Sequence, residues 1–327
     1  MKKYAFIGLL LLLSVTLHAQ ELFNLNEPAS NVPKGAFGVR AFDESYKEVT
    51  RIRNLFGVKL MYGLTSKLSV YVDATMSNHH NTVLPPGLTT HTHSGSSTTY
   101  STGNIVRGAK YPYEFNGDDL YIKYRFLTSD KQNRHFRMAV YGECSNTNVA
   151  HDENEPTLLD DNKGYGAGLI STYLVRHFAA SLTTGFIIPT AYNGYSPDPY
   201  GGTDVPTKLE YGKALIYNLS LGYLLFPRHY KDYDQTNWNI YMEFMGKSYD
   251  PAKVYQGVYG STEMVSVPIK TPLLEGGNYI ECYPGLQCII KSSTRIDFSV
   301  GFPLAGTSYV HFYPVYMIGI QQYFYPR

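Results

Sequence analysis

Four histidines lie close together in a segment rich in Ser, Thr and Gly. They form the pairs His79-His80 and His91-Thr92-His93. Neutral imidazoles bind copper, zinc or nickel, and a flexible loop could bring several of them to one ion. The alternative is a solvated loop whose histidines share no ligand, because no Cys or carboxylate accompanies them locally. The sequence favours the solvated loop and keeps metal binding as the second hypothesis.

Two further groups carry residue types that could support hydrolysis, His151-Asp152-Glu153 and Asp160-Asp161. A hydrolase needs a Ser or a water molecule that is activated by His and oriented by an acid. No Gly-x-Ser-x-Gly element, Cys-x-x-Cys pair or phosphate-binding Gly loop is present. Acidic residues in loops are commonly solvated or bind Ca²⁺. The sequence therefore predicts no catalytic residues and no cofactor, with a hydrolase as the alternative.

A third polar set is spread along the chain and alternates with apolar residues. If the alternate residues face the inside of a closed sheet, charges of both signs oppose one another there. Such charges can shape a path for ions or solutes, or they can form ion pairs that fill a narrow interior. The candidates for this lumen or selectivity role are Arg53, Lys59, Asp73, Lys123, Arg125, Arg137, Glu143, Glu243, Lys247, Glu281, Arg295, Asp297 and His311.

The composition limits the class of protein that can position these groups. The chain of 327 residues has 31 Tyr, 16 Phe and 29 Gly, 17% charged residues and a formal net charge of +1. After the N-terminal segment no apolar run reaches the length of about 18 residues that a membrane-spanning helix needs. The apolar and aromatic content excludes a disordered chain. The balanced charge gives no basis for a nucleic-acid partner.

The N-terminus has the features of an export signal. Lys2 and Lys3 precede an apolar run, which is followed by the small-residue site Leu17-His18-Ala19. The sequence therefore predicts a signal peptide over residues 1–19. The alternative is an N-terminal anchor helix, which the short apolar run and the cleavage-type site disfavour.

Apolar and polar residues alternate along twelve segments of the remaining chain. This period of two is typical of strands with two different faces, and the lengths suit strands that cross a membrane. In residues 68–76, for example, Val70 and Val72 alternate with Tyr71 and Asp73. The twelve predicted strands are 35–42, 52–62, 68–76, 120–126, 136–145, 165–174, 178–188, 213–225, 238–248, 279–290, 296–302 and 309–324.

Long and short connections alternate between these segments. The long ones include 78–116, 150–162, 189–212 and 249–278, whereas the short ones include 63–66, 175–177 and 291–294. An even strand number with this alternation is typical of an outer-membrane barrel, with long external loops and short periplasmic turns. A soluble β-sandwich has the same period. Aromatic residues near the strand ends favour the membrane barrel: Tyr62, Tyr124, Phe126, Tyr223, Phe226, Trp238, Phe324 and Tyr325.

Two sequence features carry a resemblance to known families. Residues 62–70, Tyr-Gly-Leu-Thr-Ser-Lys-Leu-Ser-Val, resemble a strand-turn-strand signature of porin-like outer-membrane transporters. Residues 322–325, Gln-Tyr-Phe-Tyr, are similar to the aromatic signal by which the barrel-assembly machinery recognises its clients. As a whole, the chain resembles outer-membrane β-barrel proteins of the Bacteroidota.

Together these observations predict an all-β protein, a closed antiparallel transmembrane β-barrel of about twelve strands. We expect a signal peptide over 1–19, a short periplasmic segment over 20–33 and the barrel over 34–327. The expected function is a channel or transporter in the cell outer membrane for small polar or amphipathic solutes. The alternative is a non-conducting surface protein that binds a partner, ligand or metal through its long external loops. The expected partners are outer-membrane lipid, the barrel-assembly machinery during biogenesis and a small solute, without nucleic acid.

Overall fold

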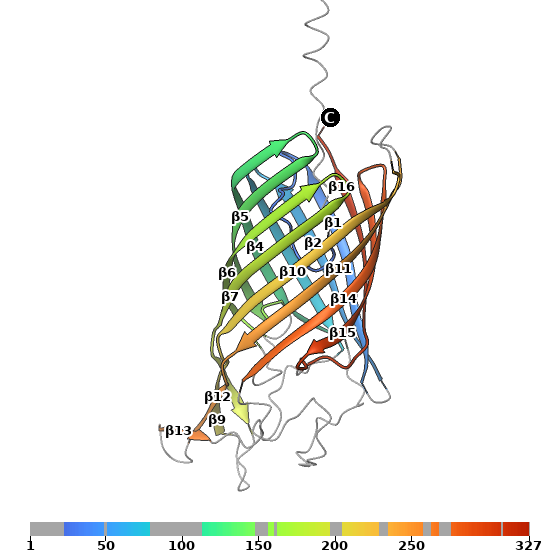
Figure 1. Ribbon diagram of the computed structural model, residues 1–327. Coiled ribbons are helices and arrows are strands. Elements are labelled where there is room, and N and C mark those ends of the chain that lie inside the picture. Colours follow the sequence, from blue (N-terminus) through green and yellow to red (C-terminus); the bar gives the residue numbers. More distant parts are fainter. Residues whose placement is uncertain are drawn as a thin grey trace, which may run out of the picture.

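Twelve strands form a closed barrel in the computed structural model, as the alternation predicts (Figure 1). The structure describes residues 23–48, 51–78, 113–147, 156–159, 162–196, 205–228, 235–257, 263–267, 276–308 and 310–326. Neighbouring strands are antiparallel throughout, and the sheet closes where β1 pairs with β16. The barrel strands are β1 (Phe37–Glu48), β2 (Arg51–Gly63), β3 (Leu68–Ser77), β4 (Glu114–Lys131), β5 (Arg134–Thr147), β6 (Gly164–Val175), β7 (Phe178–Pro189), β10 (Ala214–Phe226), β11 (Asn237–Tyr249), β14 (Gly277–Ile290), β15 (Thr294–Ala305) and β16 (Val315–Phe324).

The largest difference from the predicted strand lengths is at β4. The predicted strand covered only 120–126, because Gly117, Asp118 and the polar residues after Leu127 interrupt the apolar pattern. Backbone pairing with β5 nevertheless runs to Lys131, with a register shift between Arg125 and Leu127. Hydrogen bonding between strand backbones therefore extends this strand beyond the part that side-chain alternation marks.

The opposite difference occurs at β16. The predicted strand began at residue 309, whereas β16 begins at Val315. The residues before it fold as a loop, because the Ser308 hydroxyl oxygen accepts hydrogen bonds from the backbone N–H groups of Val310 and His311, at 3.2 and 3.3 Å. A Ser side chain that bonds to the following N–H groups offers the backbone an alternative to a strand.

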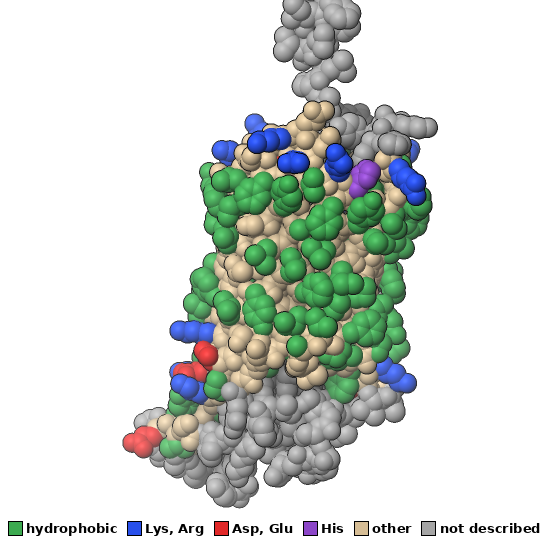
Figure 2. All heavy atoms as spheres, in the orientation of Figure 1, with side chains coloured by type: hydrophobic (Ala, Val, Ile, Leu, Met, Phe, Trp, Pro, Cys, Tyr) green, Lys and Arg blue, Asp and Glu red, His purple; other side chains and the backbone are tan. Residues whose placement is uncertain are grey.

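The two faces of the barrel differ in chemistry as the alternation requires. Apolar side chains such as Leu182, Ile240 and Ile318 are exposed on the outer face, and Figure 2 shows this apolar band around the visible side. Polar and charged side chains such as Lys123 and Glu243 are buried on the inner face. Closure pairs the backbone groups of every barrel strand, which is the condition for strands to cross lipid. No helix in the described ranges is long and apolar enough to cross a membrane.

Two of the connections that the sequence assigns to loops contain further strands. They are β8 (Tyr192–Ser196) and β9 (Val205–Glu210) in one connection, and β12 (Lys253–Gly257) and β13 (Met264–Val267) in the other. These form a separate sheet in the order β13-β12-β9-β8. Figure 1 shows this outer sheet beyond the barrel, at the end opposite to the short turns. Buried Leu209 and Val254 lie at the centre of its small core.

Candidate functional site in the barrel lumen

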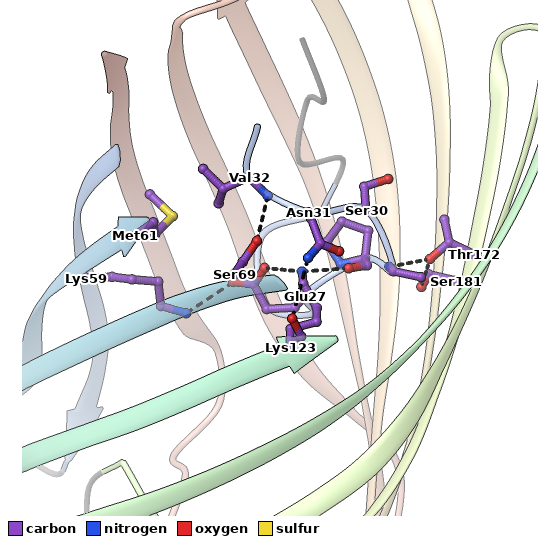
Figure 3. A network of polar contacts seen from close by, with 12 residues as sticks. Glu27, Ser30, Asn31, Val32, Lys59, Met61, Ser69, Lys123, Thr172 and Ser181 are labelled. Carbon is purple, nitrogen blue, oxygen red and sulfur yellow. Dashed lines mark hydrogen bonds and ion pairs between the residues drawn. The ribbon is translucent and has the colours of Figure 1, made fainter. Parts of the chain in front are cut away.

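The N-terminal residues that the sequence assigns to a periplasmic segment lie inside the barrel from residue 23 onward. Phe23 and Ala29 are fully buried. The Ala29 N–H donates to the Thr172 hydroxyl at 2.8 Å, and the Val32 N–H donates to the Ser69 hydroxyl at 3.0 Å (Figure 3). We call residues 23–33 the plug segment. Contacts with β3 and β6 place it within the lumen rather than outside the barrel.

Glu243 on β11 is the main anchor of the plug segment. Its carboxylate is fully buried and accepts hydrogen bonds from three consecutive backbone N–H groups, those of Asn24, Leu25 and Asn26, at 3.0, 2.9 and 3.0 Å. The Ser220 hydroxyl on β10 donates to the same carboxylate at 3.0 Å. Hydrogen bonds to a charged acceptor are the stronger kind, so the geometry stabilises a tight bend of the chain at this point.

Glu27 forms the second charged contact of the plug segment. Its two carboxylate oxygens lie 3.2 Å from Lys59 Nζ and 3.4 Å from Lys123 Nζ. Lys123 is fully buried and also donates to the Pro28 carbonyl oxygen at 2.7 Å (Figure 3). Lys59 Nζ lies 3.7 Å from Asp73 Oδ2 as well. Glu27 of the plug segment therefore bridges two bases of the wall, and Asp73 supplies the second negative charge.

Two arginines of the wall also bind the plug segment. Arg40 on β1 donates to the Asn24 carbonyl oxygen at 2.8 Å. Arg137 on β5 donates to the Ser30 hydroxyl at 3.0 Å and to Asp130 Oδ2 at 3.1 Å. The plug segment is thus held from several sides of the barrel by residues that are far apart in the sequence.

Aromatic rings fill the lumen beside the plug segment. Phe23 packs with Tyr241 and Ala179 in one buried cluster. Tyr121 stacks on Tyr141 with ring centroids 4.9 Å apart. Ala29 of the plug segment packs in the cluster that contains Tyr141. These contacts explain why tyrosines lie on the inner face as well as near the strand ends.

On the long-loop side, the β15–β16 connection folds against the wall through His311. Its Nδ1 lies 2.6 Å from a Glu281 carboxylate oxygen, and its Nε2 lies 3.1 Å from a Glu44 carboxylate oxygen. Both ring nitrogens can donate at once only when the imidazole is protonated. Burial alone would lower the pKa of His311, but the two carboxylates hold it well above its usual range. Tyr313 also donates to Glu281.

The connection between β5 and β6 also turns inward on this side. Lys247 Nζ donates to the Thr157 hydroxyl at 2.9 Å. The Thr75 hydroxyl donates to the Leu159 carbonyl oxygen at 3.0 Å, and Leu158 is buried in an apolar cluster with residues of β7, β10, β11 and β14. The lumen is therefore covered from both ends by segments that precede or connect the barrel strands.

Between these covers, carboxylates of neighbouring strands face one another. Asp73 on β3 pairs directly with Asp119 on β4, and Glu143 follows on the inner face of β5. Both aspartates are buried, and the Oδ1 atom of each has no hydrogen-bond partner in the described structure. Like charges directly opposite in a sheet are destabilising. No contact in the described structure therefore accounts for a buried carboxylate at position 119.

The thirteen predicted lumen residues divide into separate groups rather than one continuous path. Lys59, Lys123, Arg137 and Glu243 bind the plug segment, as described above. Arg53 pairs with Glu48, and Arg295 pairs with Asp297 at 2.6 Å. The groups at Lys247, Glu281 and His311 hold inward connections, and Asp73 and Glu143 belong to the acidic row. Arg125 instead donates to the Ser66 carbonyl oxygen in the β2–β3 turn, at 2.7 Å. Their role in selectivity stays a prediction.

The residues that sequence reasoning missed are of two kinds. Asn24, Asn26 and Glu27 lie in a polar segment without alternation, which gives no signal that it enters the lumen. Arg40, Glu44 and Asp119 lie in strands, and extension of the alternation along β1 and β4 would have placed them on the inner face.

The other chemical candidates fall outside the described residues. This applies to His79, His80, His91 and His93, and to the acidic and histidine groups at 151–153 and 160–161. Within the described ranges no group of three or more His, Cys, Asp or Glu side chains could hold a metal ion.

Comparison with known proteins adds information on the fold. No family model and no curated protein matches the chain. Among solved structures, an outer membrane channel from Pseudomonas putida F1 is 12% identical, with a TM-score of 0.51, covering 90% of this chain and 98% of that chain. The β-domain of the Bordetella autotransporter Brka is 10% identical, with a TM-score of 0.39 and coverages of 89% and 98%. The chain therefore has the fold of an outer-membrane β-barrel like that of the channel.

Proposed function

We propose that the protein is an outer-membrane channel for small polar or amphipathic solutes, and that the plug segment closes it at rest. In this proposal the chain is exported, the short turns face the periplasm and the long connections face outward. Removal of the plug segment would uncover an inner face that carries Tyr, Lys, Arg, Asp and Glu side chains. This mixture suits solutes with both polar and apolar parts.

The observation that supports this proposal is the polar nature of the plug contacts. Besides the apolar packing of Phe23, Ala29 and Val32, the plug segment is bound through N–H, hydroxyl, ammonium and carboxylate groups, including the bonds to Glu243, Lys59 and Lys123. Water can satisfy all of these groups once the plug segment leaves, so the net free energy of each contact is modest. A plug that never leaves would be better held by apolar contacts with the wall. Such contacts lose their stabilising free energy when water reaches the apolar surfaces.

The experiment compares single-channel currents of three forms in planar bilayers: the full mature chain, a variant without residues 23–33, and a variant with those residues replaced by Gly and Ser. We expect rare openings in the full chain and stable current steps in the deletion variant. The Gly/Ser variant keeps the length but not the anchors, so it should also conduct. A deletion variant that is folded and inserted but silent would contradict the proposal.

A second candidate function is a surface protein that binds a partner outside the membrane. The outer sheet favours it, because β8, β9, β12 and β13 extend beyond the barrel and Met264 and Val265 are exposed there. A deletion variant without conductance would favour this function.

A further inference from the structure

Seven exposed Lys and Arg side chains lie at the short-turn end of the barrel. We call this set the basic rim, and it comprises Lys34, Lys67, Lys131, Arg134, Arg176, Arg228 and Lys291. No ion pair links any of these side chains to an acid in the described part of the chain. Asp130 is the one acidic side chain on the described turns at this end, and it pairs with Arg137 and His135. The charge of the basic rim is therefore not neutralised by these turns.

The basic rim directly follows the apolar band. Exposed aromatic residues, among them Tyr62, Phe226 and Trp238, lie at the ends of the strands next to the short turns. Figure 2 shows Lys and Arg side chains beyond the apolar band at this end, whereas side chains of both signs occur at the other end. Exposed acids at the long-loop end include Asp118 and Asp250. The two ends of the barrel therefore differ in exposed charge, and the basic rim would face only one leaflet of a surrounding bilayer.

We propose that the basic rim binds the headgroups of anionic phospholipids in the leaflet that surrounds the short turns. Lys and Arg next to an apolar surface extend their charged ends to headgroup level, and each attracts an anionic surface over about a Debye length. The basic-rim residues are spaced around the whole circumference of the barrel. This arrangement suits a ring of separate lipids better than one macromolecular partner. The inference does not depend on whether the lumen conducts.

The chain contains a natural reporter for this interaction. Trp238 is the single Trp, is exposed on the outer face near the start of β11 and pairs with Phe226, two residues before Arg228. Full-length mature protein is reconstituted in vesicles that mix an unlabelled phospholipid with a brominated one, either phosphatidylglycerol or phosphatidylcholine. Bromine quenches Trp238 only from lipids that contact this part of the barrel.

We expect the association constant at Trp238 to be roughly fivefold higher for phosphatidylglycerol than for phosphatidylcholine, and to approach equality at high salt. Replacing six basic-rim residues with Gln should remove the preference: Lys67, Lys131, Arg134, Arg176, Arg228 and Lys291. The control replaces Lys47, Lys163, Lys213 and Lys253 at the long-loop end and should retain it. Equal quenching by both lipids at low salt, or a preference that survives in the basic-rim variant, would overturn the proposal. A preference lost equally in the control variant would also overturn it.

Discussion

Glu243 provides the sharpest test of the plug segment, because one carboxylate receives three backbone N–H groups from it. In Glu243→Gln, the amide keeps one oxygen that can accept two bonds, and its NH₂ group faces the remaining donor. A hydrogen bond to a charged group contributes about 1.5–3 kcal/mol, and a neutral one about 1 kcal/mol. Loss of one charged bond and weakening of the others therefore destabilises the docked plug segment by about 3 kcal/mol. That is roughly a 100-fold shift toward the undocked state, since about 1.4 kcal/mol corresponds to tenfold.

The assay measures how fast a thiol in the plug segment reacts with a bulky maleimide. Ala29→Cys is introduced after Cys144, Cys282 and Cys288 are replaced with Ser. The Ala29 side chain is fully buried against Tyr141 and Ile170 of the wall, so labelling requires that the plug segment leaves. Where docking is fast relative to labelling, the labelling rate is proportional to the undocked population. We therefore expect the labelling rate to rise about 100-fold in Glu243→Gln.

Asp297→Asn is the matched control, because Asp297 is an equally buried wall carboxylate that bonds to Arg295 and Gln287 rather than to the plug segment. It should leave the labelling rate near that of the parent. If Glu243→Gln is folded, as shown by heat-modifiable migration, and still labels at the parent rate, the role assigned to Glu243 is wrong.

Three further predictions concern the wall and the outer connections. Ile240→Arg puts a charge on the apolar outer face between the interface and the midplane and should destabilise the inserted barrel by about 1–2 kcal/mol, so wild-type amounts of folded protein in the membrane would contradict the assigned face. The carboxylates raise the pKa of His311 above its ordinary 6.5, so their contribution is complete below pH 6.5 and is lost as the pH rises through the raised value. Limited proteolysis of residues 306–314 should therefore increase at alkaline pH, and His311→Ala should be cleaved readily at every pH. Asp119→Asn removes repulsion from Asp73 at alkaline pH, where both carboxylates are ionised, and should raise the free energy of unfolding there by about 1 kcal/mol in denaturant titrations; a decrease would show that the carboxylate has a stabilising partner.

The barrel strands were predictable because a strand between lipid and a polar lumen must alternate at every second residue. Ile240 and Tyr241, one exposed and one buried, show the rule directly. The outer sheet was not predictable in this way, since β9 and β12 lie beyond the apolar band. Their pairing, for example Lys253 with Glu210, continues beyond the β10–β11 pair. There the backbone register, rather than a hydrophobic pattern, sets the structure.

The plug segment was not predictable for a different reason. Its position depends on groups such as Ser69, Thr172 and Glu243, which the fold brings together from distant parts of the sequence. A local pattern cannot reveal such contacts. Four of the inner-face residues that bind it, in contrast, were predicted as lumen residues from alternation: Lys59, Lys123, Arg137 and Glu243. A wall residue that binds a solute and one that binds the chain itself nevertheless look the same in sequence.

The plug segment also constrains the order in which the molecule can be completed. Asn24 bonds to Ser299 on β15, 275 residues later in the chain, and Val32 bonds to Ser69 only 37 residues away. Contacts over such long separations form late, because the intervening chain must first lose its conformational freedom. The first residues of the folded molecule to be synthesised must therefore wait for nearly the last ones. A nascent barrel would hold its amino-terminal residues hydrated and undocked until β15 arrives, which makes their burial a final check that the barrel strands have assembled in the correct register.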